Sequence, residues 1–528
     1  MARRRFTLPI ALLSLLAAAL LVGTAAPAQA QSPTRAATTG VRFVDIPGDG
    51  VLLKGNVVAP TTAGRHPAIV FSSSWGLNDI EYLAQANALA GHGYVVVSYT
   101  PRGWWFSGGE IDTAGPKDIA DLSRVIDWTI ANTATDATRI GAGGVSYGAG
   151  ISLLGAAFDA RIRAVASLSG WSDLVYSLYG GSTRHLQSTG LLALAAQLLG
   201  NVGPDLQGKL DDFFANRNVA QVLAWGRVRS PVTYLDALNA NRPAVLMANA
   251  WGDSIFPPNQ LTDLFGRLAG PKRLELRPGD HAIAELTGLV GLPNDVWTSV
   301  QRWFDQYLMG VDTGVTREPP VYVKPLNASA ESYASWTALV GPNHRYGLGA
   351  PRWLDQTGLL GDAPSTGWTK SLPTDRNTTA DGGIALLTNG IGAITGTQPQ
   401  IWLPTVDRGR AGVWASDRPS SAVRIRGVPT VHLNLTNTAA AGTLFAYLYD
   451  LDLLGNAKLI THAPVTWIGT APGNRSVDVP LYATAYDVPA WHSLTLVVDT
   501  VDPLYFEENA SNGAVTIAGG SYVDIPAR

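Results

Sequence analysis

The stretch that decides the fold reads RIGAGGVSYGAGISLL and spans residues 139–154. Its first part has the character of a buried strand, and its last part has the small residues of a closely packed helix. Between them, Gly144-Val145-Ser146-Tyr147-Gly148 matches the nucleophile elbow G-x-S-x-G, in which a sharp turn leaves a serine hydroxyl exposed. Chance matches are common in a chain with 56 glycines, so the prediction depends on the strand–turn–helix context.

A serine hydroxyl becomes a good nucleophile only when a histidine takes its proton and a carboxylate orients that histidine. In the fold that carries this elbow, the chain order is serine, acid, histidine. Asp253 follows the apolar run 244–249, and His281 follows the run 273–276. Both positions lie at the carboxyl ends of predicted strands, where ligands collect in open α/β sheets. We therefore predict Ser146, Asp253 and His281 as a catalytic triad.

Few residues compete for these roles. Asp280 is the nearest alternative acid, although its position next to His281 in the sequence suggests that its side chain points elsewhere. The other seven histidines either precede the acid or lie in the β-rich part of the chain, and each is better explained as structural: His66, His92, His185, His344, His432, His462 and His492.

Hydrolysis also requires donors for the oxyanion of the tetrahedral intermediate. One should be the backbone N–H of Tyr147, directly after the nucleophile. The second should come from the loop 72–76, with Ser74 or Trp75 as candidates, unless that loop only turns the chain. Several tryptophans fall on loops near the same rim and could line a substrate pocket, although packing between cap and sheet suits most of them: Trp75, Trp104, Trp105, Trp171 and Trp251.

The first half of the chain alternates short apolar runs with amphipathic stretches, which predicts an α/β fold with a mostly parallel sheet. The predicted helices include 80–90 and 118–130, and the predicted strands are 68–71, 94–99, 139–143, 164–168, 244–248 and 273–276. Residues 172–241 interrupt the alternation and are rich in Leu and Ala. We interpret them as a helical cap inserted into an α/β-hydrolase core, with a longer crossover as the alternative.

After Pro319 the helical periodicity ends and alternating segments predict an antiparallel β-sandwich. Its predicted strands are 431–436, 443–449, 465–468, 477–479 and 493–499. Glycine and proline clusters near 310–320 mark the boundary. The predicted domains are a catalytic domain at 31–312, which contains the cap, and a C-terminal sandwich at 313–528.

The N-terminus predicts export. Arg3, Arg4 and Arg5 precede an apolar stretch at 8–22, and Ala28-Gln29-Ala30 follows as a cleavage site, so residues 1–30 match a secretory signal peptide. The arginines also resemble a twin-arginine signal. The apolar stretch is short for a membrane span, which leaves an uncleaved anchor as the weaker alternative.

Composition narrows the function further. A formal net charge of −3 over 528 residues, without a later basic run, argues against nucleic-acid binding. The absence of cysteine excludes disulfides, a cysteine nucleophile and thiolate metal sites. No metal-binding or nucleotide-binding motif is present, so no cofactor is implied. We expect a soluble, unanchored mature chain that acts on a small-molecule or peptide substrate.

These residues resemble the X-Pro dipeptidyl-peptidase and cocaine-esterase-like serine hydrolases. The resemblance runs through Arg102-Gly103-x-x-x-Ser107-x-Gly109, Asp121, Val125-Ile126-Asp127-Trp128, Gly144-Val145-Ser146-Tyr147, Gly170-Trp171-x-Asp173-Leu174, Trp251-x-Asp253-x-x-Phe256 and the segment 445–452. It covers most of the mature chain. It implies a hydrolase core, a helical cap and a jelly-roll-like C-terminal sandwich that closes over the site. It also implies cleavage of an amide or ester through an acyl-enzyme.

Three positions depart from the family's usual pattern. Ala149 stands where the family elbow has its last glycine, Thr100-Pro101 replaces the usual aspartate before Arg-Gly, and the loop 72–76 lacks the tyrosine whose hydroxyl often completes the oxyanion hole. These differences leave the triad intact but weaken the case for dipeptidyl-peptidase specificity.

Three functions therefore stay open. The first is an exported acyl hydrolase for Xaa-Pro peptides or for small esters and amides. The second is a carboxylesterase without peptidase activity, which the missing tyrosine favours. The third is a secreted binding protein with a relic hydrolase core, against which the intact triad argues. The sequence gives no indication of the oligomeric state.

Overall fold

The computed structural model describes residues 37–528, which belong to one compact unit. The predicted signal peptide at residues 1–30 lies outside the described residues. Within the described range, no helix combines the length and the apolar character that crossing a bilayer requires.

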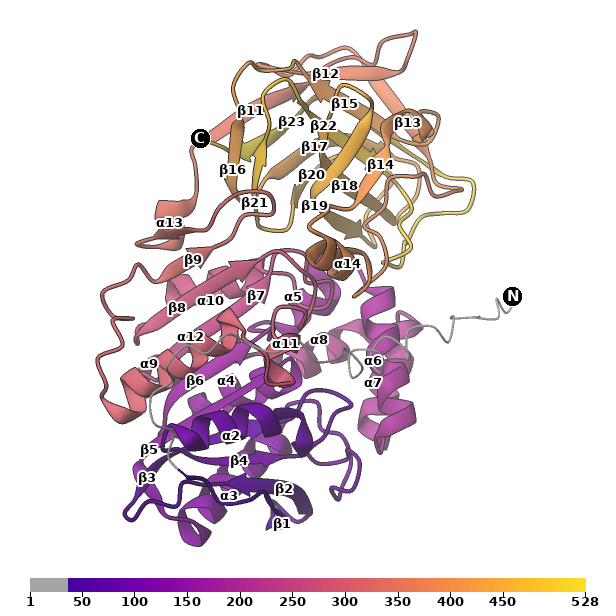
Figure 1. The fold of residues 1–528 in the computed structure, drawn as a ribbon. Coiled ribbons are helices and arrows are strands. Elements are labelled where there is room, and N and C mark those ends of the chain that lie inside the picture. The colour runs from indigo at the N-terminus through magenta and orange to yellow at the C-terminus, as the bar shows by residue number, and fades with distance from the viewer. Residues whose placement is uncertain (1–36) are drawn as a thin grey trace. The chain divides into compact units, whose positions relative to one another are not determined.

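A ten-stranded mixed sheet forms the first part of the fold (Figure 1). Its strand order is β1-β2-β4-β3-β5-β6-β7-β8-β9-β10, and the strands from β4 to β9 in this order pair in parallel. Every strand predicted here from the sequence is present. The bounds are β1 (Arg42–Pro47), β2 (Leu52–Val58), β3 (His66–Ser72), β4 (Val95–Tyr99), β5 (Thr135–Val145), β6 (Ile162–Leu168), β7 (Ala244–Ala250), β8 (Lys272–Arg277), β9 (Val321–Val323) and β10 (Glu331–Tyr333).

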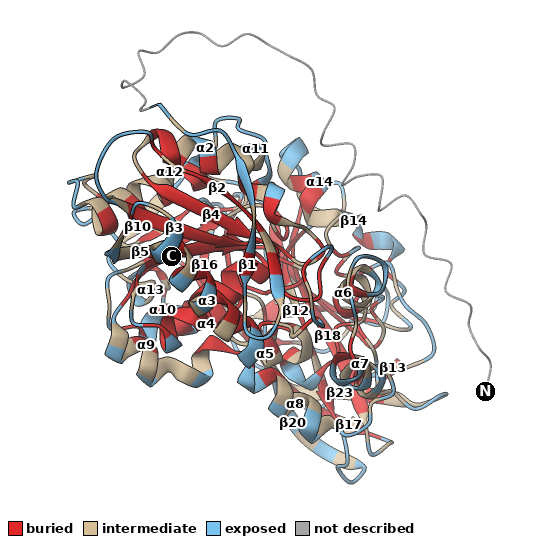
Figure 2. Ribbon diagram, turned by 90° about the horizontal axis from the view of Figure 1, so that it is seen from below, coloured by how far each residue is buried: buried red, intermediate tan, exposed pale blue. Residues whose placement is uncertain are grey.

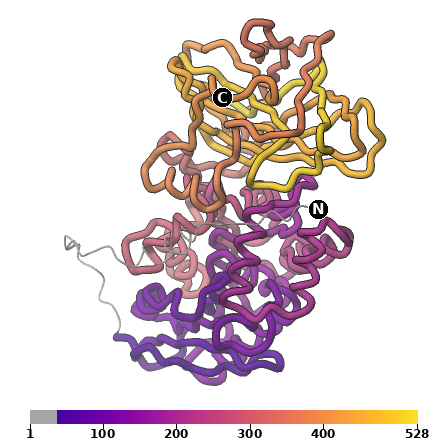
Figure 3. The backbone as a smooth tube through the Cα atoms, turned by 90° about the vertical axis from the view of Figure 1, so that its right-hand side faces the viewer, coloured from indigo at the N-terminus to yellow at the C-terminus, as the bar shows by residue number. Residues whose placement is uncertain are grey.

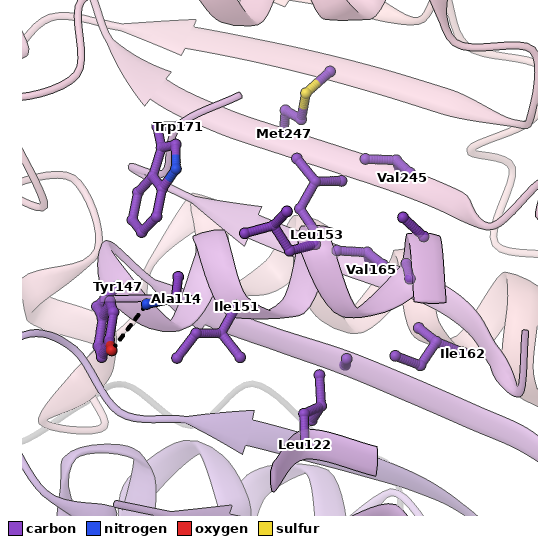
Figure 4. Packing of buried hydrophobic residues seen from close by; sticks show 14 of the residues in the cluster. Ala114, Leu122, Tyr147, Ile151, Leu153, Ile162, Val165, Trp171, Val245 and Met247 are labelled. Atoms are coloured by element: carbon purple, nitrogen blue, oxygen red, sulfur yellow. Dashed lines mark hydrogen bonds between the residues drawn. The ribbon is translucent and has the colours of Figure 1, made fainter. Parts of the chain in front are cut away.

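Helices cover both faces of this sheet, and its central strands are buried (Figure 2). The side chains of β4 alternate between the two faces of the sheet. Val95 and Val97 belong to one hydrophobic cluster, and Val96 belongs to another. On α3, which was predicted at 118–130, one face is buried and carries Ile119, Leu122, Val125, Ile126 and Thr129. Figure 4 shows α4 packing its aliphatic side chains against those of the strands. The helices are α2 (Leu83–Gly91), α3 (Pro116–Asn132), α4 (Tyr147–Phe158), α10 (Asn259–Arg267), α11 (Leu286–Leu289) and α12 (Asp295–Phe304).

Helices fill the interval between β6 and β7, as expected of an inserted cap. Because β6 and β7 are neighbours in the sheet, the chain leaves and re-enters it at adjacent strands. The cap helices are α5 (Leu174–Tyr179), α6 (Leu186–Leu199), α7 (Pro204–Phe214), α8 (Val219–Val228) and α9 (Leu235–Asn241), with short 3₁₀ turns at Gly180–Ser182 and Pro231–Tyr234.

Strands β9 and β10 follow the predicted boundary at 310–320, yet they extend the first sheet. β9 pairs in parallel with β8, and β10 returns antiparallel to β9. Residues 321–333 therefore belong to the hydrolase sheet by hydrogen bonding. The exact division between the two domains stays a prediction.

A second, eleven-stranded sheet makes up most of the C-terminal part. Four predicted strands lie within β17 (Thr430–Asn437), β18 (Gly442–Leu451), β20 (Gly473–Pro480) and β22 (Ser493–Asp499), and the prediction at 465–468 meets only the end of β19 (Asn456–Trp467). The remaining strands were not predicted: β11 (Asn343–Leu348), β12 (Thr357–Gly361), β13 (Thr369–Pro373), β14 (Gln400–Trp402), β15 (Gly412–Ser416) and β23 (Ala514–Pro526), with β16 (Val423–Gly427) and β21 (Thr484–Val488) as a separate pair.

This second sheet folds over on itself, which gives the expected sandwich. β17 and β18 lie far apart in the strand order, yet Leu433 of β17 and Leu448 of β18 share one hydrophobic cluster. The opposite face of β18 is buried too, because Phe445 and Tyr447 enter another cluster that includes Leu504. In Figure 3 the orange and yellow part of the chain doubles back repeatedly over itself.

A buried ion pair explains part of the sequence resemblance. The Arg102 guanidinium donates to both carboxylate oxygens of Asp121 on α3, at 2.7 and 2.8 Å, and the two side chains are 5% and 0% exposed. Nearby, the Ser107 hydroxyl donates to the carbonyl of Thr100. These motif residues therefore fix the loop after β4, and they do not contact Ser146 directly.

We predict that Asp121→Ala lowers the free energy of unfolding by about 3–5 kcal/mol, because it leaves the buried Arg102 guanidinium without its counter-charge. Chemical denaturation of the purified variant measures this loss. Arg317→Ala is the control, since the Arg317–Asp312 pair is well exposed and should contribute nothing measurable. Equal stability of Asp121→Ala and wild type would contradict the prediction.

Candidate active site

The elbow between β5 and α4 holds Ser146 in a strained backbone conformation. Its φ is 57° and its ψ is −113°, a region that side-chain-bearing residues rarely occupy. The turn is possible only because two glycines flank it. A Cβ on Gly148 would collide with the backbone carbonyl oxygen of Ser72, and one on Gly144 would lie 2.8 Å from the same oxygen. This supports the interpretation of the motif, since no other residue type fits at either glycine.

The structure brings the three predicted triad residues together. His281 Nε2 lies 2.8 Å from Ser146 Oγ, and His281 Nδ1 lies 2.9 Å from Asp253 Oδ2. Ser146 follows β5, Asp253 follows β7 and His281 follows β8, so all three stand at the carboxyl ends of parallel strands. The arrangement is the hydrogen-bonded chain of hydroxyl, imidazole and carboxylate that nucleophilic catalysis by serine needs.

Backbone donors fix the Asp253 carboxylate. Its Oδ1 accepts from the N–H groups of Ile255 and Phe256 at 2.9 and 2.7 Å, which leaves Oδ2 for His281. The carboxylate is fully buried. Burial lowers the pKa of His281, but the adjacent Asp253 carboxylate more than offsets this effect, so the pKa of His281 lies above its ordinary value.

Asp280, the alternative acid, is used differently. Its Oδ1 accepts from the backbone and hydroxyl of Ser254 and from the backbone N–H of His281, whereas the His281 ring bonds Asp253. Burial, followed by the nearby Asp253 charge, raises the pKa of Asp280 to about 6. Asp280 therefore links, by hydrogen bonds, the loop that carries Asp253 to the loop that carries His281.

The two candidates for the second oxyanion donor differ in their hydrogen bonds. The Ser74 N–H donates to Glu81 at 2.7 Å, and the Ser74 hydroxyl lies within hydrogen-bonding distance of Glu81 and of the Val145 carbonyl, so both donors of Ser74 are in use. No acceptor in the described range takes the backbone N–H of Trp75. Tyr147 is the first residue of α4, where a helix leaves its N–H groups without intrahelical partners. Trp75 and Tyr147 are therefore the better donor pair.

Two acids that the sequence analysis did not single out, the half-buried Glu81 and the buried Asp118, support these donors. Glu81 holds Ser74, and burial raises the pKa of Glu81 to about 7. Asp118 accepts from the Tyr147 hydroxyl at 2.5 Å, and burial, followed by Asp112, raises the pKa of Asp118 to about 8. Figure 4 shows the Tyr147 hydroxyl also accepting from the backbone of Ala114. In the sequence both acids are simply polar residues of predicted helices.

Aromatic rings surround the nucleophile in an unbroken series. The ring centroids lie 5.1 Å apart for Trp75–Tyr147, 6.5 Å for Tyr147–Trp171, 5.0 Å for Trp171–Phe256 and 5.1 Å for Phe256–His281. Of the other tryptophans predicted near the rim, Trp104 is buried against Trp75, Trp105 is 45% exposed, and Trp251 donates to the Lys324 carbonyl.

A pocket of about 920 Å³, including its open mouth, extends from Ser146 into the cap. The hydrolase core contributes Trp75, Tyr147, Trp171 and Phe256 to its wall. The cap contributes mainly aliphatic and aromatic side chains from α5 to α8, among them Leu174, Leu178, Leu192, Leu206, Leu210, Phe213, Val222, Leu223 and Trp225. A largely apolar pocket that opens at Ser146 is a candidate substrate site by its shape and position.

A segment of the C-terminal part also contacts the loop that carries Asp253. The Leu386 N–H donates to the Ser254 hydroxyl at 2.9 Å, and the Asn389 amide donates to the Gly252 carbonyl at 3.0 Å. Asn389 lies on α14 (Thr388–Thr395). Residues 252–254, which carry Asp253, are therefore fixed by both domains. Nothing in the sequence around 386–389 marks this contact.

Two family models match the chain in succession. The model described as X-Pro dipeptidyl-peptidase (S15 family) matches residues 49–283, and the model of the X-Pro dipeptidyl-peptidase C-terminal non-catalytic domain matches residues 313–522. Among curated proteins, an uncharacterised 31.7 kDa protein of Escherichia coli is 29% identical over 111 residues. That match covers 21% of this chain and only 39% of the Escherichia coli protein.

Solved structures with the same fold cover nearly the whole chain. A CocE/NonD family hydrolase from Staphylococcus aureus has a TM-score of 0.68 at 14% identity, over 93% of this chain and 97% of its own. An aminopeptidase from the marine sediment archaeon Thaumarchaeota archaeon has a TM-score of 0.71 at 15% identity, over 96% and 99%. An α-amino acid ester hydrolase reaches 0.71 at 16% identity, over 95% and 98%.

The fold predicted from the sequence, an α/β-hydrolase core with an inserted cap and a C-terminal β-sandwich, is thus confirmed, and the two family models together span both of its domains. The chain belongs to the X-Pro dipeptidyl-peptidase (S15) family of serine hydrolases.

Proposed function

We propose that this protein hydrolyses ester or amide bonds through an acyl-enzyme on Ser146, with His281 as general base and acid and Asp253 as the residue that orients it. The observation that carries the proposal is the continuous pair of hydrogen bonds from Ser146 Oγ to His281 and from His281 to Asp253. A secreted binding protein with a relic core would have no need to keep this geometry.

In the first half of the reaction, Ser146 Oγ attacks the substrate carbonyl carbon while His281 Nε2 takes the hydroxyl proton. The carbonyl oxygen becomes an oxyanion, which the backbone N–H groups of Tyr147 and Trp75 stabilise. The intermediate then collapses, the bond to the leaving alcohol or amine breaks, and His281 donates its proton to that group.

In the second half, water attacks the acyl-enzyme. His281 Nε2 takes a proton from the water, the second oxyanion forms between the same two donors, and the bond to Ser146 Oγ breaks. The proton held by His281 returns to Ser146, and a carboxylic acid leaves. Every proton transfer in both halves passes through the same imidazole nitrogen.

Ser146→Ala should lower kcat by about four to six orders of magnitude with little loss of stability, because the hydroxyl is the attacking atom. A fluorophosphonate probe should label the wild-type protein on Ser146, as located by peptide mapping, and should not label the variant. Labelling of another serine, or full activity without Ser146, would overturn the proposal.

Asp253→Asn and Asp280→Asn form a matched pair of carboxylate-to-amide changes. Asp253→Asn should cost about 10⁴-fold in kcat, because an amide cannot hold the required tautomer of His281. Asp280→Asn should cost less than about tenfold, since its remaining oxygen can still accept from Ser254 and from the His281 backbone. Steady-state kinetics on one phenyl ester compare the two, and a reversed order would assign the acid to Asp280.

The kcat/KM of the wild type should fall as the pH decreases through the pKa of His281, because protonated imidazole cannot accept the serine proton. Since Asp253 holds this pKa above 6.5, the midpoint of the acid limb should lie above 6.5. In Asp253→Asn the raising charge is gone, so the midpoint of the residual activity should move to lower pH. An acid limb that does not move would contradict Asp253 as the partner of His281.

We also propose that the protein is exported and that residues 1–30 are removed. The three arginines, the apolar stretch at 8–22 and the Ala28-Gln29-Ala30 site support this proposal. The same segment supports use of the twin-arginine route, which would carry the chain after folding.

Expression in a bacterial host should therefore give extracytoplasmic protein that begins at Gln31, as determined by N-terminal sequencing. Replacing Arg3, Arg4 and Arg5 by glutamine removes the positive n-region and should leave uncleaved precursor inside the cell. Efficient export of that variant, or retention of residues 1–30 on exported protein, would contradict this proposal.

A further inference from the structure

The cap pocket stands on the acyl side of the reacting carbonyl. His281 must protonate the leaving group, so the leaving group lies beside the His281 ring. His281 itself does not line the cap pocket, although Phe256, which packs against the His281 ring, does. Trp75 and Tyr147, the two residues with the oxyanion donors, also line the pocket. A carbonyl bound to those donors therefore directs its acyl group into the cap.

The described pocket offers an ammonium group no counter-charge. Among residues 37–528, no aspartate or glutamate lines the pocket, and Lys209 is the only charged side chain that does. A protonated amine in the acyl group would thus meet apolar side chains and find no counter-charge.

Carboxylates close in sequence to the lining residues are already engaged. Asp112 pairs with Arg229, Asp205 accepts from the indole of Trp225 at 2.8 Å, and Asp173 accepts from the backbone N–H of Tyr176 at the start of α5. None of the three lines the pocket. An ammonium ion without a counter-charge is expensive to bury.

From the pocket lining and its position, we infer that this enzyme takes acyl groups that are uncharged and apolar, and that it rejects substrates with a free α-ammonium group on the acyl side. The inference rests on the proposed function and narrows it. A dipeptidyl-peptidase releases an N-terminal dipeptide, whose free ammonium belongs to the acyl group, so unblocked Xaa-Pro peptides are not substrates. Esters of branched aliphatic or aromatic acids fit the pocket instead.

Three phenyl esters with related acyl groups test this inference. They are the 4-methylpentanoate, the leucine ester, which adds an α-amino group, and the N-acetylleucine ester, which keeps the bulk at that position but carries no charge. At pH 5.5 the 4-methylpentanoate should exceed the leucine ester in kcat/KM by about 100-fold, because only about 1% of a free α-amino group is uncharged at that pH. The N-acetyl ester should recover much of the loss, because charge and not size causes it.

The pH dependence separates the substrate's charge from the enzyme's own titration. Titration of His281 affects all three esters alike and cancels in the ratio of their kcat/KM values. A free α-amino group has a pKa of about 7.7. The ratio of kcat/KM for the 4-methylpentanoate to kcat/KM for the leucine ester should therefore shrink by about tenfold per pH unit as the pH rises towards that value. A ratio near one that does not change with pH would overturn the inference.

A pair of pocket variants tests the same point from the protein side. Leu223 on α8 lines the pocket, is half-buried and lies outside the main hydrophobic clusters. Leu223→Glu should improve the kcat/KM ratio of the leucine ester to the 4-methylpentanoate by at least about tenfold relative to Leu223→Gln, which has the same shape without the charge. Equal ratios in the two folded variants would place the acyl group elsewhere and overturn the inference.

The outcomes also separate this inference from the proposed function. If Ser146 is labelled and the leucine ester is turned over as well as the neutral ester, the acyl-enzyme chemistry stands and the substrate class is wrong. If no ester is turned over and the fluorophosphonate does not label Ser146, the proposed function itself fails. Should Leu223→Glu not fold, the three esters on the wild type still decide the question.

Discussion

The architecture of the site depends on one close approach, that of Gly148 to the carbonyl oxygen of Ser72. This contact lets α4 begin directly against the end of β3, so that the loop after β3 and the N-terminus of α4 come together. The Trp75 and Tyr147 N–H groups belong to these two segments. The strained Ser146 backbone is the other product of the same turn. Nucleophile and oxyanion donors are therefore set by one packing constraint, before any substrate is present.

The acid and the histidine are held by a separate system that reaches beyond the first sheet. Asp280 links their two loops through Ser254, and Ser254 accepts from the backbone of Leu386 in the C-terminal part. Buried and half-buried carboxylates with raised pKa values also surround the site, at Glu81, Asp118 and Asp280. Each accepts hydrogen bonds from backbone or hydroxyl donors, which is how a buried acid can be accommodated without a full counter-charge.

How much the sequence reveals depends on how local the signal is. The α/β order, the elbow and the positions of Ser146, Asp253 and His281 follow from motifs and strand ends, and the geometry agrees with them. Many sandwich strands were missed, because their pairing is long-range: β23 pairs with β11, β13 and β17 from distant parts of the chain. Glu81, Asp118 and Asn389 were missed for a similar reason, since their roles arise from tertiary contacts. Ser74 and Trp75 could be distinguished only once the bonds of Glu81 were known.

The insertion of the cap between two neighbouring strands has a consequence for the pocket. Since the chain departs from β6 and returns to β7 at adjacent positions, the sheet gives the insert fixed anchor points while leaving its length and sequence free. Ser146, Asp253 and His281 lie outside the insert, whereas most of the pocket wall lies within it. A change confined to this single contiguous segment can therefore reshape the pocket while the elbow and the strand ends that hold Ser146, Asp253 and His281 stay in place.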